Sequence, residues 1–503
     1  MYAGIDCGTQ STKVILIDTV SKKIIGEGQA KHHLISEANG KREQEPQWWI
    51  DALISAFHKA TQNAQINPKL ISGIAVSGQQ HGLVALDKHG DVLIPAKLWC
   101  DTETSLENEE ILEKLGGKSA SLSELGLVIS TGYTASKILW LKKYHPEAWQ
   151  KLDCILLPHD YLNFWLTGRK VMENGDASGT GLFDVRKCCW SERAINTIDT
   201  SDHLRQALPQ LVKYDQIIGT VQSEVAEILG ISPSTLVAAG GGDNMMGAIG
   251  TGNVQQGIIT MSLGTSGTLF GFANQPISPA SELIANFCAS THGWLPLICT
   301  MNITSATSLV QNLFEQDLTQ FNQAIESAPI GAEGVTVLPF FNGERVPNLP
   351  NAKAIIAGLD ATNFTPNNLI RAVLEGATFS LRYGLDLFSQ ANITPTQIRL
   401  IGGGAKSAVW RQIVADVMNC PIICLSYAEA AALGAAIQAA WVIGIQNKSL
   451  NEHEKQTQLV QLCDQFVTLD EQTLTIPKTE NVKQYQTIYI NYLSLLNKYY
   501  LEK

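Results

Sequence analysis

The residues best suited to chemistry lie in a glycine-rich stretch at 240–244, which reads Gly-Gly-Gly-Asp-Asn. It follows an apolar run at 236–239, which has the length and composition of a short buried strand. Three glycines let the backbone turn sharply and come close to a ligand, so Asp243 would hold its carboxylate at the mouth of a binding site. That placement suits a catalytic base. The same pattern also fits a plain turn in which the aspartate bonds to its own backbone.

Two Gly-Thr turns, at Gly8-Thr9 and Gly264-Thr265, share one design. Each follows a strand-like run, has a second threonine three positions after the first, and leads into another strand-like run. The amides and hydroxyls of such a turn can point at one phosphate group. A plain hairpin is the alternative for the first turn taken alone. Because the turns lie close to half the chain length apart, they indicate an internal duplication, and we expect both to face one nucleotide.

A third strand-like run, at 70–77, leads into Gly-Gln-Gln-His-Gly at 78–82. Ligands of α/β folds bind at such strand ends. The amide of Gln80 and the imidazole of His81 could hydrogen-bond a polyhydroxylated ligand. A histidine that is satisfied within a surface turn is the alternative interpretation.

A glycine-rich loop at 402–404 follows the strand-like run at 398–401 and precedes a predicted helix at 408–418. Backbone amides at a helix N-terminus can approach a flat or anionic ligand such as a nucleotide. The spacing is not that of a Walker loop, and it lacks the G-x-G-x-x-G of a Rossmann fold. This loop is therefore a second candidate nucleotide contact.

The elements around these motifs alternate between strands and helices. A helix begins near Pro46, another follows the cap Thr365, and a strand is expected at 93–98. Residues 445–478 give no clear signal, whereas apolar residues at helical spacing predict a docking helix within 482–496. Three short strands open the chain, at 2–6, 13–18 and 24–29.

Length and composition limit the possible classes. A chain of 503 residues exceeds the size of a single core, so two domains are expected. The net charge of -11 and the lack of a basic run argue against nucleic-acid partners. Anionic ligands would then be held by backbone amides or by a metal. No segment resembles a membrane span or a signal peptide, which favours the cytoplasm.

The ten cysteines are scattered and form no C-x-x-C pair. Most lie in apolar runs, where a free cysteine behaves as a small hydrophobic residue. The adjacent Cys188 and Cys189 could be redox-active.

Taken together, the motifs resemble the FGGY family of carbohydrate kinases over essentially the whole chain, and are most similar to its xylulose-phosphorylating members. Singly each motif is weak, but in this order they are highly specific. The motifs are Gly4 to Lys13, Ser77 to Gly82, Gly240 to Asn244, Ser262 to Gly267, Gly343 to Pro347 and Ile401 to Ala405.

This resemblance implies an α/β fold of the actin/hexokinase (ribonuclease H-like) type, duplicated into two domains with an interdomain cleft. Residues 1–246 would form the N-terminal FGGY domain, which binds the sugar, and residues 247–503 the C-terminal FGGY domain, which binds ATP. It assigns Asp243 as the catalytic base and Asp6 as the carboxylate on the Mg²⁺ side. The implied sugar contacts are Gln80, His81, Asp243 and Asn244. The implied nucleotide contacts are Gly8, Thr9, Gly264, Thr265, Gly403, Gly404 and Ser407.

The reaction implied is transfer of the γ-phosphoryl group of ATP to D-xylulose, giving D-xylulose 5-phosphate. Two departures bear on the sugar: Gln80 stands where many relatives have methionine, and Glu103 where many have arginine. Kinases of ribulose, gluconate or glycerol remain alternatives, as does a non-catalytic sugar sensor or an actin-like assembly protein. Neither nucleic acid nor a membrane is an expected partner, and a homodimer is one assembly that the resemblance allows.

Overall fold

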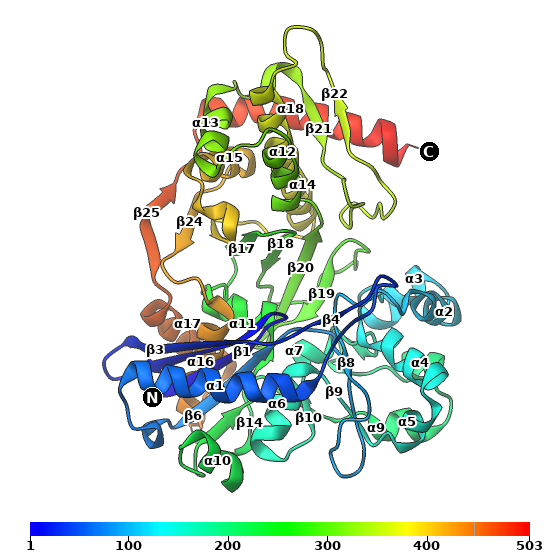
Figure 1. Ribbon diagram of the computed structural model, residues 1–503, viewed down its shortest axis with the longest axis vertical. Coiled ribbons are helices and arrows are strands. Elements are labelled where there is room, and N and C mark those ends of the chain that lie inside the picture. The colour runs from blue at the N-terminus through cyan, green and yellow to red at the C-terminus, as the bar shows by residue number, and fades with distance from the viewer. Residues whose placement is uncertain (447, 503) are drawn as a thin grey trace. The chain divides into compact units, whose positions relative to one another are not determined.

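The computed structural model describes residues 1–446 and 448–502 and divides the chain into two compact α/β units (Figure 1). The first comprises Met1–Val254, Ala273–Pro296 and Glu429–Val467, and the second comprises Gln255–Phe272, Leu297–Ala428 and Thr468–Lys503. The expected division was a single cut after residue 246. The chain instead passes between the units several times, and a late segment returns to the first unit.

The first unit is built on a sheet with the order β14-β15-β6-β1-β2-β3, in which β16 also pairs with β6. The hairpin pairs β1–β2 and β2–β3 are antiparallel, whereas β6 runs parallel to β1 and β15 parallel to β6. The strands are β1 (Tyr2–Cys7), β2 (Ser11–Asp18), β3 (Lys23–Lys31), β6 (Gly73–Gly78), β14 (Ile217–Thr220), β15 (Leu236–Ala238) and β16 (Gly241–Gly242).

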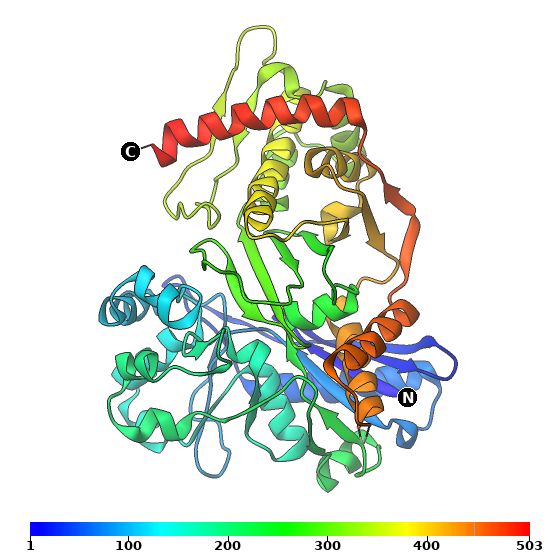
Figure 2. The ribbon, with the colours of Figure 1, turned by 180° about the vertical axis from the view of Figure 1, so that it is seen from behind.

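Helices cover both faces of this sheet. On one face Gly28 leaves room for α1 (Pro46–Ala64), because a Cβ there would lie 2.0 Å from the carbonyl oxygen of Ala56. On the other face Gly4 does the same for α16 (Ala430–Ile445), with a Cβ 2.0 Å from the carbonyl oxygen of Ala432. Figure 1 shows α1 in front of the sheet, and Figure 2 shows the opposite face. Small residues thus set how closely the layers approach.

The second sheet has the order β19-β20-β18-β17-β23-β24-β25. Here β17 pairs antiparallel with β18 and parallel with β23, and β23 runs parallel to β24. Strands β20-β18-β17-β23-β24 repeat the order and relative directions of β3-β2-β1-β6-β15 in the first unit. This repeat confirms the predicted duplication and the α/β class. The strands are β17 (Ile258–Leu263), β18 (Gly267–Gly271), β20 (Trp294–Thr300), β23 (Gln397–Ile401), β24 (Ile422–Leu425) and β25 (Leu469–Thr475).

The remaining elements are helices, short strands and single helical turns. Further helices of the first unit are α2 (Ser105–Leu115), α3 (Lys118–Leu125), α4 (Thr134–Tyr144), α5 (Pro146–Lys151), α6 (Pro158–Thr167), α7 (Asn174–Ala177), α8 (Glu192–Ile198), α9 (Asp202–Ala207), α10 (Ser223–Leu229), α11 (Asp243–Gly250) and α17 (Glu452–Phe466). Helices of the second unit are α12 (Thr304–Leu313), α13 (Leu318–Ser327), α14 (Pro366–Gln390), α15 (Ala408–Met418) and α18 (Thr479–Leu496). Short strands are β4 (Ile35–Ser36), β5 (Arg42–Gln44), β7 (Val84–Leu86), β8 (Ala96–Lys97), β9 (Cys154–Leu156), β10 (Val171–Glu173), β11 (Phe183–Asp184), β12 (Cys189–Trp190), β13 (Gln210–Val212), β19 (Ala285–Cys288), β21 (Thr336–Leu338) and β22 (Ile355–Ala357). Single turns of tighter or wider helix occur at η1 (Pro68–Leu70), η2 (Ala332–Gly334), η3 (Gly403–Lys406) and η4 (Asn497–Leu501).

Most local predictions match these elements. Pro46 does open a helix, and the side chain of Thr365 caps α14 by accepting a hydrogen bond from Asn368 N. The strand expected at 93–98 is reduced to the two residues of β8. Residues 445–478, which gave no signal, contain α17 and β25.

The predicted C-terminal docking helix is α18, which packs on α14 and α15 in the second unit. The hydroxyl of Tyr485 accepts a hydrogen bond from Arg371 Nη2 at 2.8 Å and donates one to Glu375 Oε1 at 3.0 Å. All three side chains are buried. A buried arginine-glutamate pair needs hydrogen-bond partners for its remaining polar atoms, so Tyr485 has a structural role.

No helix among the described residues combines the length and the apolar character needed to cross a lipid bilayer.

Candidate active site

The glycine-rich stretch forms β16 and delivers Asp243 to the first turn of α11. Gly240 has φ +73°, and a Cβ there would lie 2.2 Å from the carbonyl oxygen of Val76. Only glycine meets both conditions without strain. The buried side chain of Gln438, from α16, holds the turn: it accepts from Gly240 N at 2.9 Å and donates to Gly240 O at 3.1 Å and to Ser290 O at 3.1 Å.

Asp243 and Gln80 are joined by one amide. Asn244 Nδ2 donates to Asp243 Oδ1 at 2.9 Å and to Gln80 Oε1 at 2.9 Å, and Asn244 N donates to the same Asp243 oxygen at 2.7 Å. Burial raises the pKa of Asp243 to about 7, and the negative charges of Asp6 and Asp176 act in the same direction. A carboxylate with a pKa near neutrality suits general base catalysis.

Asp6 lies at the end of β1, beside the end of β6. Ser77 Oγ donates a hydrogen bond to Asp6 Oδ1 at 2.8 Å. Burial raises the pKa of Asp6 to about 6, although the bond from Ser77 and the charge of Lys13 lower it. Lys13 itself is paired with Glu429. The site therefore contains two carboxylates, and the charge of Asp6 helps to raise the pKa of Asp243.

Of the two glutamines after β6, Gln79 is structural and Gln80 faces the site. Gln79 Nε2 donates to Gln44 Oε1 at 2.9 Å, and its Oε1 accepts from Thr9 Oγ1 at 3.2 Å. Gln80 is 4% exposed, and among the described residues its Nε2 has no hydrogen-bond partner. A buried amide donor without a partner costs free energy, which a hydroxyl-bearing ligand would recover.

His81 is held by aromatic neighbours. Its ring centroid lies 4.5 Å from that of Tyr133 and 5.7 Å from that of Phe287. It adopts φ +64°, which is uncommon outside glycine and is frequent at functional sites. A Cβ at Gly179 would lie 2.3 Å from the ring, so this glycine makes room for the imidazole.

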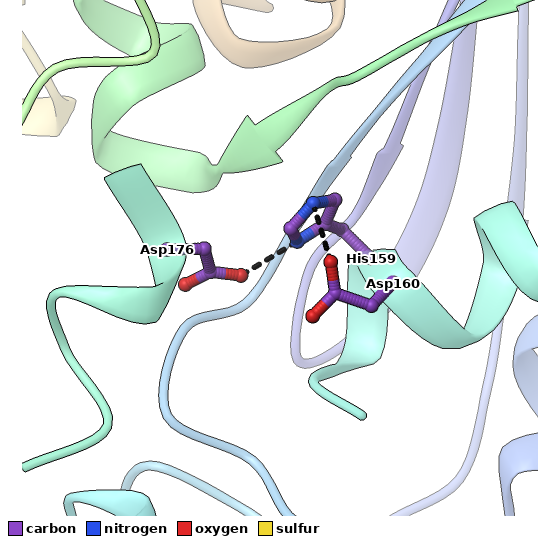
Figure 3. Close-up of side chains that lie close together, drawn as sticks. All are labelled: His159, Asp160 and Asp176. Atoms are coloured by element: carbon purple, nitrogen blue, oxygen red, sulfur yellow. Dashed lines mark hydrogen bonds and ion pairs between the residues drawn. The ribbon is translucent and has the colours of Figure 1, made fainter. Parts of the chain in front are cut away.

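A buried ionic cluster, His159, Asp160 and Asp176, lies against the end of β6 (Figure 3). His159 Nδ1 donates to Asp176 Oδ2 at 2.6 Å, and Nε2 lies 3.0 Å from Asp160 Oδ1. Burial lowers the pKa of His159, but the charges of Asp160 and Asp176 outweigh it and raise the pKa to about 9. The imidazolium therefore supplies the positive charge that these buried carboxylates need.

Sequence reasoning did not identify His159. No helical or strand period marks the loop at 174–184, and a lone His-Asp pair after Pro158 has no recognisable spacing. A Cβ at Gly78 would lie 2.8 Å from both the backbone nitrogen and the Cβ of His159. The close contact between His159 and the strand that leads to Gln80 is what links His159 to the site, and only the fold reveals this contact.

The first Gly-Thr turn is largely satisfied within the protein. Gly8 N donates to Ser11 O at 3.1 Å, and the hydroxyl of Thr9 accepts from Trp99 Nε1 at 3.0 Å. In the second unit Gly264 O accepts from Thr304 N at 3.0 Å, while the side chain of Thr265 is exposed. Both turns stand at the end of the equivalent strand, β1 or β17.

The glycine loop after β23 lies against the second Gly-Thr turn. Gly402 has φ +92°, and a Cβ there would lie 3.1 Å from Gly264 N. A Cβ at Gly403 would meet nothing within 4 Å, so the space above this exposed glycine is open, whereas Gly404 is packed on Trp410. Ser407 caps α15, accepting from the amide of the same tryptophan at 3.3 Å.

Glu103, one of the two departures noted above, is used internally. Its carboxylate lies 2.5 Å from the buried Lys97 Nζ and accepts from Asn39 Nδ2 at 2.8 Å. Lys97 also contacts Glu43 at 3.0 Å and Asp101 at 3.2 Å. The carboxylates of Glu43, Asp101 and Glu103 therefore serve as counter-charges of the buried Lys97 rather than as a metal site.

The structure thus gathers the candidate residues into two sets, one in each unit. The set in the first unit is Asp6, Gly8, Thr9, Gln80, His81, Asp243 and Asn244. The set in the second unit is Gly264, Thr265, Gly403, Gly404 and Ser407.

Comparison with known proteins separates the candidate residues into the same two sets. Residues 1–250 match the N-terminal domain of the FGGY family of carbohydrate kinases, and residues 259–443 match its C-terminal domain. The xylulose kinase of Haemophilus influenzae is 52% identical, with 99% of this chain and 100% of that protein covered. The xylulose kinase of Streptomyces rubiginosus is 36% identical, with 88% of each chain covered.

A solved structure described as a xyloylose kinase from Brucella ovis superposes with a TM-score of 0.90 at 27% identity, and the match covers 100% of both chains. Both family domains therefore occur here in order, on a duplicated fold in which an aspartate with a pKa of about 7 follows a glycine turn. The chain belongs to the FGGY family of carbohydrate kinases.

Proposed function

We propose that this protein transfers the γ-phosphoryl group of ATP to the terminal hydroxyl of D-xylulose, forming D-xylulose 5-phosphate. The full-length similarity to proteins named xylulose kinase supports the choice of sugar. The single structural observation that carries the proposal is the joined group Asp243, Asn244 and Gln80. It places a base of pKa about 7 beside an unpartnered amide donor.

In this mechanism Asp243 accepts the proton of the sugar hydroxyl as that oxygen attacks phosphorus. Phosphoryl transfer needs little covalent help from the protein, so positioning and charge stabilisation contribute most of the rate enhancement. Asn244 fixes the carboxylate through two hydrogen bonds. Gln80 and His81 would hold the other hydroxyls, and Nε2 of Gln80 is the donor in need of an acceptor.

The residues fit the nucleotide and the metal that such a reaction uses. Asp6 offers a carboxylate oxygen, the ligand type that Mg²⁺ prefers. Open space above Gly403 and the exposed Thr265 suit a nucleotide on the second unit, with Gly264, Gly404 and Ser407 around it. Bound Mg²⁺ would offset the negative charge of the phosphates. Thr9 would contribute its backbone amide from the first unit, beside Gly8, whose own amide already donates to Ser11 O.

The compartment we propose is the cytoplasm. All ten cysteines are unbridged, as is usual for proteins of reducing compartments.

A coupled ADP-release assay over a sugar panel tests the proposal. We expect the highest kcat/KM with D-xylulose, compared with ribulose, gluconate and glycerol, and loss of turnover when EDTA removes Mg²⁺. A clear preference for one of the other sugars would replace D-xylulose as the substrate. Sugar-independent or absent ADP release would support a non-catalytic sugar sensor or an actin-like assembly protein instead.

A further inference from the structure

Two cysteines that are far apart in the sequence face each other in the first unit. Cys188 follows β11, Cys288 ends β19, and their Sγ atoms lie 3.9 Å apart. Both sulfurs also lie near one carbonyl oxygen, that of Val185, at 3.8 and 3.5 Å. The pair therefore differs from the one that the sequence suggested, since Cys188 faces Cys288 rather than its neighbour Cys189.

The two thiols differ in access and in acidity. Cys188 is half-buried, and the hydrogen bond with the Cys288 thiol lowers its pKa to about 7. Cys288 is buried, and its pKa is raised, first by the same hydrogen bond and then by burial. At neutral pH Cys188 thus supplies a reachable thiolate, while Cys288 is the protonated thiol beside it. A low-pKa, accessible thiol next to a second one is the arrangement of redox-sensing cysteines.

We propose that Cys188 and Cys288 form a reversible disulfide when the protein meets a peroxide. The Cys188 thiolate attacks one peroxide oxygen, the O–O bond breaks, and a sulfenic acid and hydroxide form. Cys288 Sγ then attacks the Cys188 sulfur and gives up its proton, so that the S–S bond forms and water leaves. The two thiols lose two electrons, which reduce hydrogen peroxide to two molecules of water.

Closing this bond would disturb the residues around His81. The sulfurs must approach from 3.9 Å to about 2.05 Å, the length of a disulfide. The backbone of Cys288 is restrained against this movement, because Cys288 N donates a hydrogen bond to Ser178 Oγ at 3.1 Å. The preceding residue, Phe287, has its ring 5.7 Å from that of His81. Oxidation is therefore expected to weaken sugar binding, a consequence that rests on the proposed kinase function.

Bond formation can be tested without any activity assay. The reduced protein is treated with hydrogen peroxide, its remaining thiols are alkylated, and the peptides are mapped by mass spectrometry. We expect a Cys188–Cys288 linkage that dithiothreitol removes. Cys288→Ser should form no disulfide and should accumulate a dimedone-reactive sulfenic acid at Cys188. Cys189→Ser, the matched control at the exposed neighbour, should oxidise as the wild type does.

Two results would overturn the proposal. One is a wild-type protein whose Cys188 and Cys288 stay reduced at peroxide doses that sulfenylate Cys188 in Cys288→Ser. The other is a disulfide that forms through Cys189.

In a second arm, the oxidised wild type should show a several-fold higher KM for D-xylulose, restored by dithiothreitol, while Cys288→Ser keeps its KM. A mapped disulfide with an unchanged KM would refute the effect on the sugar site, whereas absent sugar turnover in the reduced protein would refute the kinase function alone.

Discussion

Replacing Asp243 by asparagine removes the proposed base while keeping its shape. The Oδ1 atom of asparagine can still accept the two hydrogen bonds from Asn244, so the start of α11 should be preserved. General base catalysis typically contributes about 10²–10⁴-fold to the rate, which corresponds to roughly 2.7–5.5 kcal/mol of transition-state stabilisation. We therefore expect kcat to fall by this factor, with a much smaller change in the KM for the sugar.

The pH dependence gives a second measure of the same residue. With a pKa of about 7, Asp243 is ionised in about a tenth of the molecules at pH 6 and about nine tenths at pH 8. Because only the ionised form accepts a proton, kcat/KM of the wild type should rise across this interval and level off above it. The residual activity of Asp243→Asn should lack that rise.

Stability should change in the opposite direction to activity. The folded-state pKa of Asp243 is raised above its ordinary value of 3.8, so the folded protein loses stability as pH rises from there to about 7. Asparagine carries no charge to desolvate, and the variant should melt at a higher temperature than the wild type at pH 8. Loss of activity together with higher stability would exclude misfolding as the cause.

The assay is ADP release over a range of D-xylulose concentrations, which gives kcat and KM, with a thermal melt of the same samples. Asp51→Asn, on the exposed side of α1, is the matched control and should leave kcat and melting temperature unchanged. If Asp243→Asn kept kcat within a few-fold of the wild type, the assignment of the base would be wrong. A pH profile that is flat between 6 and 8 in the wild type would contradict the raised pKa.

Three further predictions concern stability and can be checked by urea unfolding or thermal melts. Gly240→Ala should destabilise the protein by at least about 1–2 kcal/mol, because the backbone there is left-handed. Its control is Gly444→Ala, in open space within α16, which should be neutral or stabilise the protein by up to about 1 kcal/mol. Tyr485→Phe should cost about 1.5–3 kcal/mol, since its hydroxyl bonds two charged groups, whereas the exposed Tyr499→Phe should cost nothing measurable. Burial raises the pKa of Glu173 to about 8, so stability should fall as pH rises from 4.5 toward 8, and Glu173→Gln should flatten this fall. An equal loss of stability in Gly240→Ala and Gly444→Ala would contradict the role of the left-handed backbone. An equal loss in Tyr485→Phe and Tyr499→Phe would contradict the contribution of the buried hydroxyl. An unchanged dependence of stability on pH in Glu173→Gln would contradict the raised pKa of Glu173.

The sequence predicted the parts of the fold that depend on local pattern. The opening strands, the helix from Pro46 and the repeat of Gly-Thr turns follow from residue spacing and turn chemistry, and the matching strand orders confirm the duplication. It did not predict where the segment after Glu429 packs, because α16 is apolar on nearly every side. A helix without a polar face carries no sequence signal about which sheet it will cover.

The candidate site shows the same limit. Asp243 and Gln80 stand in recognisable glycine-bounded motifs, so they could be named from sequence. Their partners could not: His159 acts through contact with Gly78, and Gln438 reaches the turn from almost two hundred positions away. Such contacts are created only when the sheet forms, and no spacing rule anticipates them.

The packing of α16 explains why the turn that carries the proposed base depends on residues from the second half of the chain. In the duplicated topology α11 follows β15 as α16 follows β24, so the two helices are equivalent. They pack on each other through glycine, since a Cβ at Gly434 would lie 1.8 Å from the carbonyl oxygen of Met246.

Contact this close leaves little room for α16 to shift without moving α11, and α11 begins at Asp243. Gln438 adds a second link, because its amide closes three hydrogen bonds with the backbone of Gly240 and Ser290 in a fully buried setting. Breaking these bonds would leave buried backbone groups unsatisfied, which costs more than the bonds contribute when made. The position of the proposed base is therefore set by a helix that the sequence places in the other half of the duplication.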